Sequence, residues 1–170
     1  MADGGFDPGR RRVLFGRARD PGAPVRPPWA RRDAFLDLCT RCGACAAACP
    51  ETIIVAGDGG FPTVDFRQGE CTFCGACADA CPQPLFDRQE APWRLEPRIG
   101  KGCLTRAAVI CQTCRDICPE GAMRFIPVRG AVWQPSVDAA RCTGCGACVS
   151  ACPASAVNLA PARKETGRGP

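Results

Sequence analysis

Apolar and polar residues alternate only over short distances in this chain, which predicts short strands. Residues 52–64 contain two β-prone stretches around a glycine-rich turn at 56–60, a pattern typical of a β-hairpin. Stretches of the same kind at 123–126 and 131–133 predict a second hairpin, and 156–159 predicts a further short strand. We therefore expect small sheets and no long regular elements.

The cysteines follow one spacing. Four runs approximate C-x-x-C-x-x-C-x-x-x-C-P, and together they contain all sixteen cysteines of the chain. Three thiolates two residues apart converge only if the backbone curls tightly, and Gly43, Gly75 and Gly146 can adopt the positive φ that such a curl needs. The spacing predicts cubane [4Fe-4S] clusters. The predicted metal ligands are Cys39, Cys42, Cys45, Cys49, Cys71, Cys74, Cys77, Cys81, Cys103, Cys111, Cys114, Cys118, Cys142, Cys145, Cys148 and Cys152.

The spacing resembles that of bacterial two-cluster ferredoxins, in which the fourth cysteine of each run ligates the cluster of the partner run. Pairing adjacent runs then implies four ligand sets. They are Cys39, Cys42, Cys45 with Cys81; Cys71, Cys74, Cys77 with Cys49; Cys103, Cys111, Cys114 with Cys152; and Cys142, Cys145, Cys148 with Cys118.

The resemblance also implies an α+β fold of two tandem 2[4Fe-4S] ferredoxin-like modules, with short hairpins, short helices and a small conventional core. Module 1 covers residues 33–91 with the runs 39–49 and 71–81, and module 2 covers residues 92–160 with the runs 103–118 and 142–152. A basic, Arg/Pro-rich N-terminal arm at 1–32 and a disordered tail at 161–170 flank the modules.

The third run departs from the common spacing. Residues 104–110 separate Cys103 from Cys111, and Gln112 and Thr113 replace the usual Gly-Ala. A longer loop still delivers a thiolate, but the site is expected to be looser and wetter. We expect three clusters at the regular runs and favour a fourth here. In the alternative, Cys103 or the whole run is structural or unoccupied.

Disulfides and zinc are the alternative uses of so many cysteines. Disulfides require an oxidising compartment, and the chain has no apolar segment of signal-peptide length. Zinc sites combine pairs of C-x-x-C knuckles or include histidine, and this chain has no histidine. Both alternatives suit the pattern less well than iron–sulfur clusters do.

Composition limits the core that the protein can build. Hydrophobic residues make up 46% of the chain, but the sixteen cysteines belong to that fraction, aromatic residues contribute only 6%, and tyrosine is absent. Cluster ligation must therefore supply much of the folding free energy. We expect the cluster-free protein to be largely unfolded.

Positive charge is concentrated in the arm. Residues 1–32 contain eight arginines and three aspartates, whereas residues 33–170 have no net charge. The arm includes a twin-arginine without a following hydrophobic segment, so we expect a cytoplasmic protein without a membrane span. A solvated, disordered leader is one interpretation, and partner docking is the other. Nucleic-acid binding is not expected, because the cluster-bearing modules would repel phosphates. The partner-binding candidates are Arg10, Arg11, Arg12, Leu14, Phe15 and Trp29.

The chain offers no catalytic residues of its own. It has no nucleotide-binding glycine loop, no histidine base and no spare cysteine. If cysteine occupies all four ligand positions of each cubane, the iron has no open position for a substrate. We therefore predict an electron-transfer or maturation protein that is not an enzyme.

The whole chain resembles the NapF ferredoxin-type proteins associated with periplasmic nitrate reductase. The resemblance covers the arginine arm, Arg26-Pro27-Pro28-Trp29, Cys39-Thr40-Arg41-Cys42, Gly60-Phe61-Pro62, the long gap after Cys103, and residues 142–148. It implies a cytoplasmic protein that binds the catalytic nitrate reductase subunit, as its precursor, before export and assists cluster insertion or reduction. The alternative is a freely diffusing electron-transfer ferredoxin or an electron-relay subunit of an oxidoreductase complex.

Overall fold

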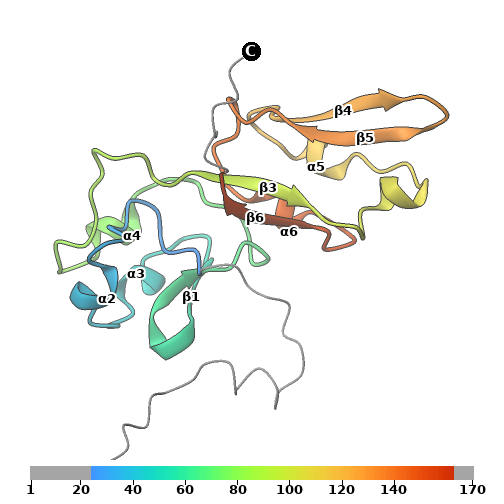
Figure 1. Ribbon diagram of the computed structural model, residues 1–170. Helices are drawn as coiled ribbons and strands as arrows, with labels where there is room; N and C mark the ends of the chain where they lie inside the picture. Colours follow the sequence, from blue (N-terminus) through green and yellow to red (C-terminus); the bar gives the residue numbers. More distant parts are fainter. Residues whose placement is uncertain (1–23, 163–170) are drawn as a thin grey trace, which may run out of the picture.

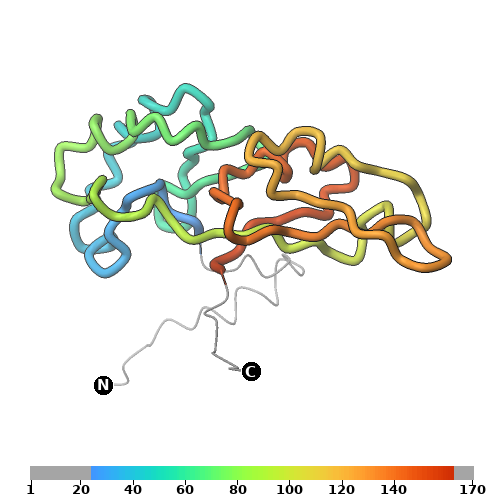
Figure 2. Tube along the Cα trace, turned by 90° about the horizontal axis from the view of Figure 1, so that it is seen from above, coloured from blue at the N-terminus to red at the C-terminus, as the bar shows by residue number. Residues whose placement is uncertain are grey.

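Each half of the protein is built around two cysteine runs. The structure is a computed structural model, and it describes residues 24–162. The two halves lie side by side, with the pair of strands β3 and β6 near the middle (Figure 1; Figure 2). The first half contains α2 (Phe35–Leu38), α3 (Ala44–Ala47), β1 (Ile54–Ala56), η1 (Asp58–Gly60), β2 (Pro62–Val64) and α4 (Ala76–Asp79).

The second half repeats this plan with longer strands. Its elements are β3 (Leu95–Ile99), η2 (Leu104–Ala107), α5 (Thr113–Asp116), β4 (Met123–Val128), β5 (Ala131–Val137), α6 (Ala147–Ser150) and β6 (Val157–Pro161). In both halves a hairpin joins the two cysteine runs, and the predicted α+β class is confirmed. None of the helices within residues 24–162 has the length and apolar character needed to cross a membrane.

Residues 24–162 form three two-stranded antiparallel sheets, and two of them were predicted. The β1–β2 hairpin places Ile54 opposite Val64. The β4–β5 hairpin extends further than the sequence predicts and has an irregularity between Ile126 and Val128, where Pro127 lies. The third sheet pairs β3 with β6 and was not predicted for residues 95–99, which the sequence analysis assigned to the inter-module connection.

The short helices start where the glycine pattern predicts. Gly43, Gly75 and Gly146 have φ values of 79°, 83° and 93°, and each is the N-cap of the helix that follows the second cysteine of its run. The third run lacks this glycine, and Gln112 takes its place with a negative φ of −130°. Helix α5 still forms, because the amides of Arg115 and Asp116 both donate to the Gln112 carbonyl oxygen.

Residues 24–32, which belong to the predicted arm, pack against the first half. Ala30 forms an antiparallel bridge with Phe86, and the Trp29 amide donates to the Pro92 carbonyl at 2.8 Å. These contacts join the segment before the first run to the segment after the second run. The β3–β6 sheet makes the equivalent connection around the third and fourth runs.

One hydrophobic core extends through both halves. Ile54, Val64 and Phe66 from the first half belong to the same buried cluster as Leu95 and Met123 from the second. Three of its buried members are the cysteines Cys45, Cys77 and Cys148. Three of the predicted metal ligands therefore form part of the core, and the two halves share this core.

Candidate metal centres

The cysteines surround four separate cavities, each lined by four of them. The cavities have similar volumes, about 340 to 360 Å³ when the space open to solvent is counted. Every cavity combines three cysteines of one run with the fourth cysteine of the adjacent run. Site 1 contains Cys39, Cys42, Cys45 and Cys81; site 2 contains Cys71, Cys74, Cys77 and Cys49; site 3 contains Cys142, Cys145, Cys148 and Cys118; and site 4 contains Cys103, Cys111, Cys114 and Cys152.

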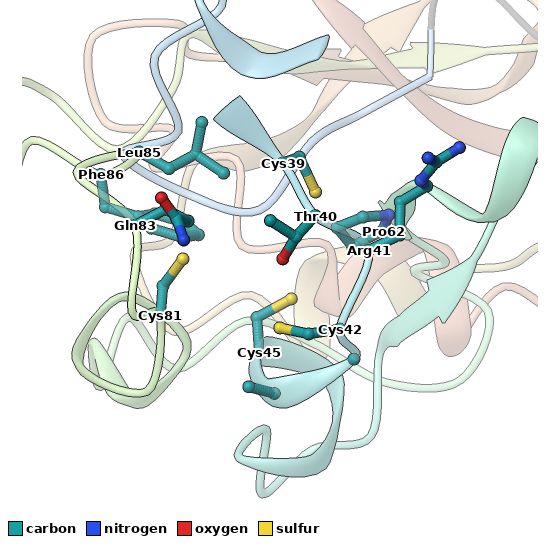
Figure 3. A pocket seen from close by; sticks show the side chains of 12 residues that line it. Cys39, Thr40, Arg41, Cys42, Cys45, Pro62, Cys81, Gln83, Leu85 and Phe86 are labelled. Carbon is teal, nitrogen blue, oxygen red and sulfur yellow. The ribbon is translucent and has the colours of Figure 1, made fainter. Parts of the chain in front are cut away.

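The geometry of site 1 illustrates the arrangement. Figure 3 shows the sulfurs of Cys39, Cys42, Cys45 and Cys81 around one common space. Three of these cysteines come from the loop and helix at α3, whereas Cys81 comes from the chain that follows α4. The structure therefore groups the cysteines as the crossed pairing expects, and their role as ligands remains a prediction.

Backbone amides and hydroxyl groups are directed at several of the sulfurs. The amide of Ala44 lowers the pKa of the Cys42 thiol below its ordinary value, and the Thr40 side chain adds to this effect. The amides of Ala122 and Ala156 donate to the Sγ atoms of Cys118 and Cys152, both at 3.3 Å. Hydrogen bonds to ligating sulfurs stabilise negative charge and tune the reduction potential of a bound cluster.

Burial opposes ionisation at the inner cysteines. It is the largest cause that raises the pKa of Cys77 and of Cys148 to about 12, and the neighbouring Cys71 and Cys145 add to these two shifts respectively. Burial likewise raises the pKa of Cys71 and of Cys114 to about 11. Without a positively charged partner these thiols stay protonated at neutral pH. A cationic iron core would stabilise them as thiolates.

The four cysteines of each site fit a group that is larger than a single metal ion. A tetrahedral zinc site draws its ligands to about 2.3 Å from the metal. Within residues 24–162, no three or more Cys, His, Asp or Glu side chains form a group that could hold a single metal ion. The four cysteines of each site instead stand around a cavity with mostly apolar walls. This donor set and this space suit a cysteine-ligated [4Fe-4S] cluster.

Site 4 differs from the other three in burial. The third cysteine of the run is buried at sites 1, 2 and 3, as Cys45, Cys77 and Cys148, whereas the corresponding Cys114 is only half-buried. Cys111 also lines a surface groove beside β4 and β5, where Ile110 is 79% exposed and Trp133 is 52% exposed. The second cysteines of sites 1 and 2, Cys42 and Cys74, are exposed, whereas Cys111 is half-buried. The burial of the cysteines therefore does not make site 4 wetter than the other sites, and its looseness stays a prediction.

The inserted loop of site 4 is nevertheless held in place. Thr105, in η2, is buried, and its hydroxyl lies 3.2 Å from the Sγ of Cys103. Gln134 of β5 donates from Nε2 to the Thr105 carbonyl at 3.1 Å. The sequence analysis did not identify Thr105 or Gln134, because no motif marks them and they lie 29 residues apart.

The partner-binding candidates fall into two groups. Arg10, Arg11, Arg12, Leu14 and Phe15 lie outside the described residues. Trp29 is half-buried, and its ring makes an edge contact with Phe73 and a cation–π contact with Arg88. Its contacts within the first half therefore account for much of its surface, and a role in docking stays a prediction.

Comparison with known proteins agrees with this arrangement. The 4Fe-4S dicluster domain matches residues 38–84 and 109–167, so its second match begins after Cys103. The ferredoxin-type protein NapF of Escherichia coli K12 is 44% identical over 154 residues, covering 89% of this chain and 94% of the relative. NapF of Haemophilus influenzae is 49% identical over 137 residues, covering 79% of this chain and 78% of the relative. The chain belongs to the NapF family of ferredoxin-type proteins.

Other ferredoxin-type proteins are more distantly similar. NapG of Haemophilus influenzae is 32% identical over 156 residues, covering 77% of this chain and 56% of the relative. Family membership and the sixteen cysteines show that the chain is an iron–sulfur protein with several [4Fe-4S] clusters. When bound, such clusters supply one-electron transfer. The polypeptide provides the thiolates, the amide hydrogen bonds and the apolar walls around them.

Proposed function

We propose that this chain is a cytoplasmic protein that binds three to four [4Fe-4S] clusters, with four favoured, and that it assists maturation of the catalytic subunit of periplasmic nitrate reductase before that subunit is exported. Membership of the NapF family is the observation that carries this proposal. Its contribution would be cluster insertion or redox support. The catalytic subunit, still in its precursor form, is the proposed partner, with neither nucleic acid nor a membrane involved.

The cysteine sets support a role in redox or maturation rather than catalysis. Each cavity is lined by four cysteines, so the four cavities together account for all sixteen cysteines of the chain. A fully cysteine-ligated cubane has no open iron position for a substrate. Redox support for a partner therefore suits these sites, and the presence of four cysteines around site 4, as around the regular sites, supports a fourth cluster.

The arm is the proposed docking segment for the precursor. The sequence of the arm is positively charged, whereas each cluster ligated by four thiolates contributes a charge of about −2 to the rest of the protein. We propose that Arg10, Arg11 and Arg12 supply electrostatic attraction and that Leu14 and Phe15 supply apolar contact. The matched control lies in the packed segment 24–32, where Arg31 forms an exposed ion pair with Asp33.

Replacing Arg10, Arg11 and Arg12 with alanine should reduce capture of the nitrate reductase precursor by at least about tenfold in an anaerobic pull-down, because three charges are lost from the contact. The visible cluster absorption of the variant should remain that of the wild type. Arg31→Ala removes one exposed charge and should capture the precursor normally. Undiminished capture by the triple variant would exclude the arginines as the docking element.

The alternative is a freely diffusing electron-transfer ferredoxin or an electron-relay subunit. A diffusing carrier would reduce a partner without forming a stable complex, and its transfer rate would fall steeply as salt screens the encounter. Stable precursor capture together with weak salt dependence of reduction supports the maturation role. Reduction without stable capture, at a rate that falls steeply as salt is added, supports the diffusing carrier.

A further inference from the structure

The junction between the two halves lies at sites 2 and 3. The amide of Cys71, the first cysteine of site 2, donates to the carbonyl of Cys145, the second cysteine of site 3, at 2.8 Å. This bond joins two loops that wrap around different cavities. It is a direct backbone connection between a ligand loop of the first half and one of the second.

Aromatic packing holds the same two loops together. Phe73 and Gly144 occupy equivalent positions, each immediately before the second cysteine of its run. The Trp93 ring, from the connection between the halves, lies against Phe73 with a centroid separation of 5.7 Å. A Cβ placed on Gly144 would lie 3.1 Å from Trp93 Nε1, so the indole also lies against the loop of site 3.

Phe66 completes the junction from the first half. It is buried and follows β2, and its ring makes an edge contact with Trp93 at 5.6 Å. The same ring covers Gly146, where an added Cβ would overlap it, 2.7 Å from the ring Cγ. Gly146 therefore needs its lack of a side chain for two reasons: its positive φ and the ring that lies on it.

Within each half, the two sites are also neighbours. Helix α3 carries Cys45 of site 1 and contacts α4, which carries Cys77 of site 2. Helix α5 carries Cys114 of site 4 and contacts α6, which carries Cys148 of site 3. Together with the junction, these contacts connect the sites in the order 1, 2, 3, 4.

We infer that Phe66, Trp93 and Gly146 are positioning residues that hold sites 2 and 3 side by side, so that the protein carries one continuous series of four sites instead of two independent pairs. The inference rests on the clusters of the family and not on the proposed partner. The ends of the series are site 1 in the first half and site 4 in the second. A one-electron donor and a one-electron acceptor can then engage opposite ends of the molecule.

The first test measures magnetic coupling by low-temperature EPR of the full chain, reduced anaerobically with titanium(III). The signal of site 2 is identified as the one lost on Cys49→Ser. Cys145→Ala removes a cysteine of site 3. It should slow the electron-spin relaxation of the site 2 signal, because the coupled cluster of site 3 enhances that relaxation. Cys111→Ala, which removes the corresponding cysteine of site 4, should leave the site 2 signal unchanged. An equal effect of the two variants, or no effect of either, would overturn the inference.

The second test leaves all cysteines in place. Gly146→Ala adds both backbone strain and overlap with Phe66, whereas Gly43→Ala adds strain at a similar φ with no atom within 4 Å of the new Cβ. We expect Gly146→Ala to lose the coupling between sites 2 and 3 and Gly43→Ala to keep it. Phe66→Ala removes the same contact without adding backbone strain at Gly146, and it should also weaken the coupling.

Two outcomes of the second test would count against the junction. Coupling that persists in Gly146→Ala would show that the Phe66 contact does not set the spacing. Equal loss in Gly43→Ala would assign the effect to backbone strain. If Gly146→Ala does not fold, the comparison of Cys145→Ala with Cys111→Ala decides the question alone.

Discussion

Replacing Cys49 with serine should remove the cluster of site 2 and spare that of site 1, although Cys49 belongs to the same run as the site 1 cysteines Cys39, Cys42 and Cys45. The cause is geometric, because Cys49 lines the cavity of Cys71, Cys74 and Cys77. The cysteine run that lines site 1 thus supplies one cysteine, Cys49, to site 2. Loss of one site should lower the iron content by about four irons per chain.

The matched variant is Cys81→Ser. Cys81 lies in the second run but lines the cavity of site 1, so its replacement should remove the cluster of site 1 and spare site 2. Low-temperature EPR of the two reduced variants should show loss of different signals. If Cys49→Ser instead removes the same signal as a substitution at Cys42, the crossed pairing is wrong.

Removing the clusters should unfold the protein. Cys45, Cys77 and Cys148 are buried members of the shared core, and each belongs to a cavity that the cluster would fill. The net stability of a whole domain is about 5–15 kcal/mol. A single structural metal site contributes a comparable amount, about 10–16 kcal/mol in zinc-finger peptides. Loss of several clusters should therefore exceed the stability that the remaining apolar contacts provide.

Anaerobic chelation of the iron, followed by circular dichroism and a thermal scan, measures this effect. We expect the cooperative unfolding transition to disappear and the amide protons of β3 and β6 to lose their protection from exchange. Reconstitution with iron and sulfide should restore both. A cluster-free protein that still melts cooperatively would show that the polypeptide core is sufficient by itself.

Local patterns predicted the parts of the fold that depend on near neighbours. The β1–β2 hairpin follows from alternating residues around a glycine-rich turn, and the helix starts follow from Gly43, Gly75 and Gly146. The cysteine sets of the four cavities agree with a resemblance to two-cluster ferredoxins. Such features need only spacing and the allowed φ of glycine.

Contacts between distant segments were not predictable in this way. Strand β3 contains Pro97 and pairs with β6, about 60 residues later, so neither its composition nor its neighbours indicate a strand. The contact between Phe66 and Gly146 likewise joins residues of different halves. The seven-residue gap after Cys103 gave no sign that Gln134 would hold Thr105.

The most direct test of four iron–sulfur sites is quantitation of iron and acid-labile sulfide on anaerobically purified protein, with native mass spectrometry of the same sample. We predict about sixteen irons and sixteen sulfides per chain, and one dominant mass that corresponds to four [4Fe-4S] clusters. About twelve of each would contradict a fourth cluster. A colourless, sulfide-free and folded protein would contradict the cluster assignment as a whole.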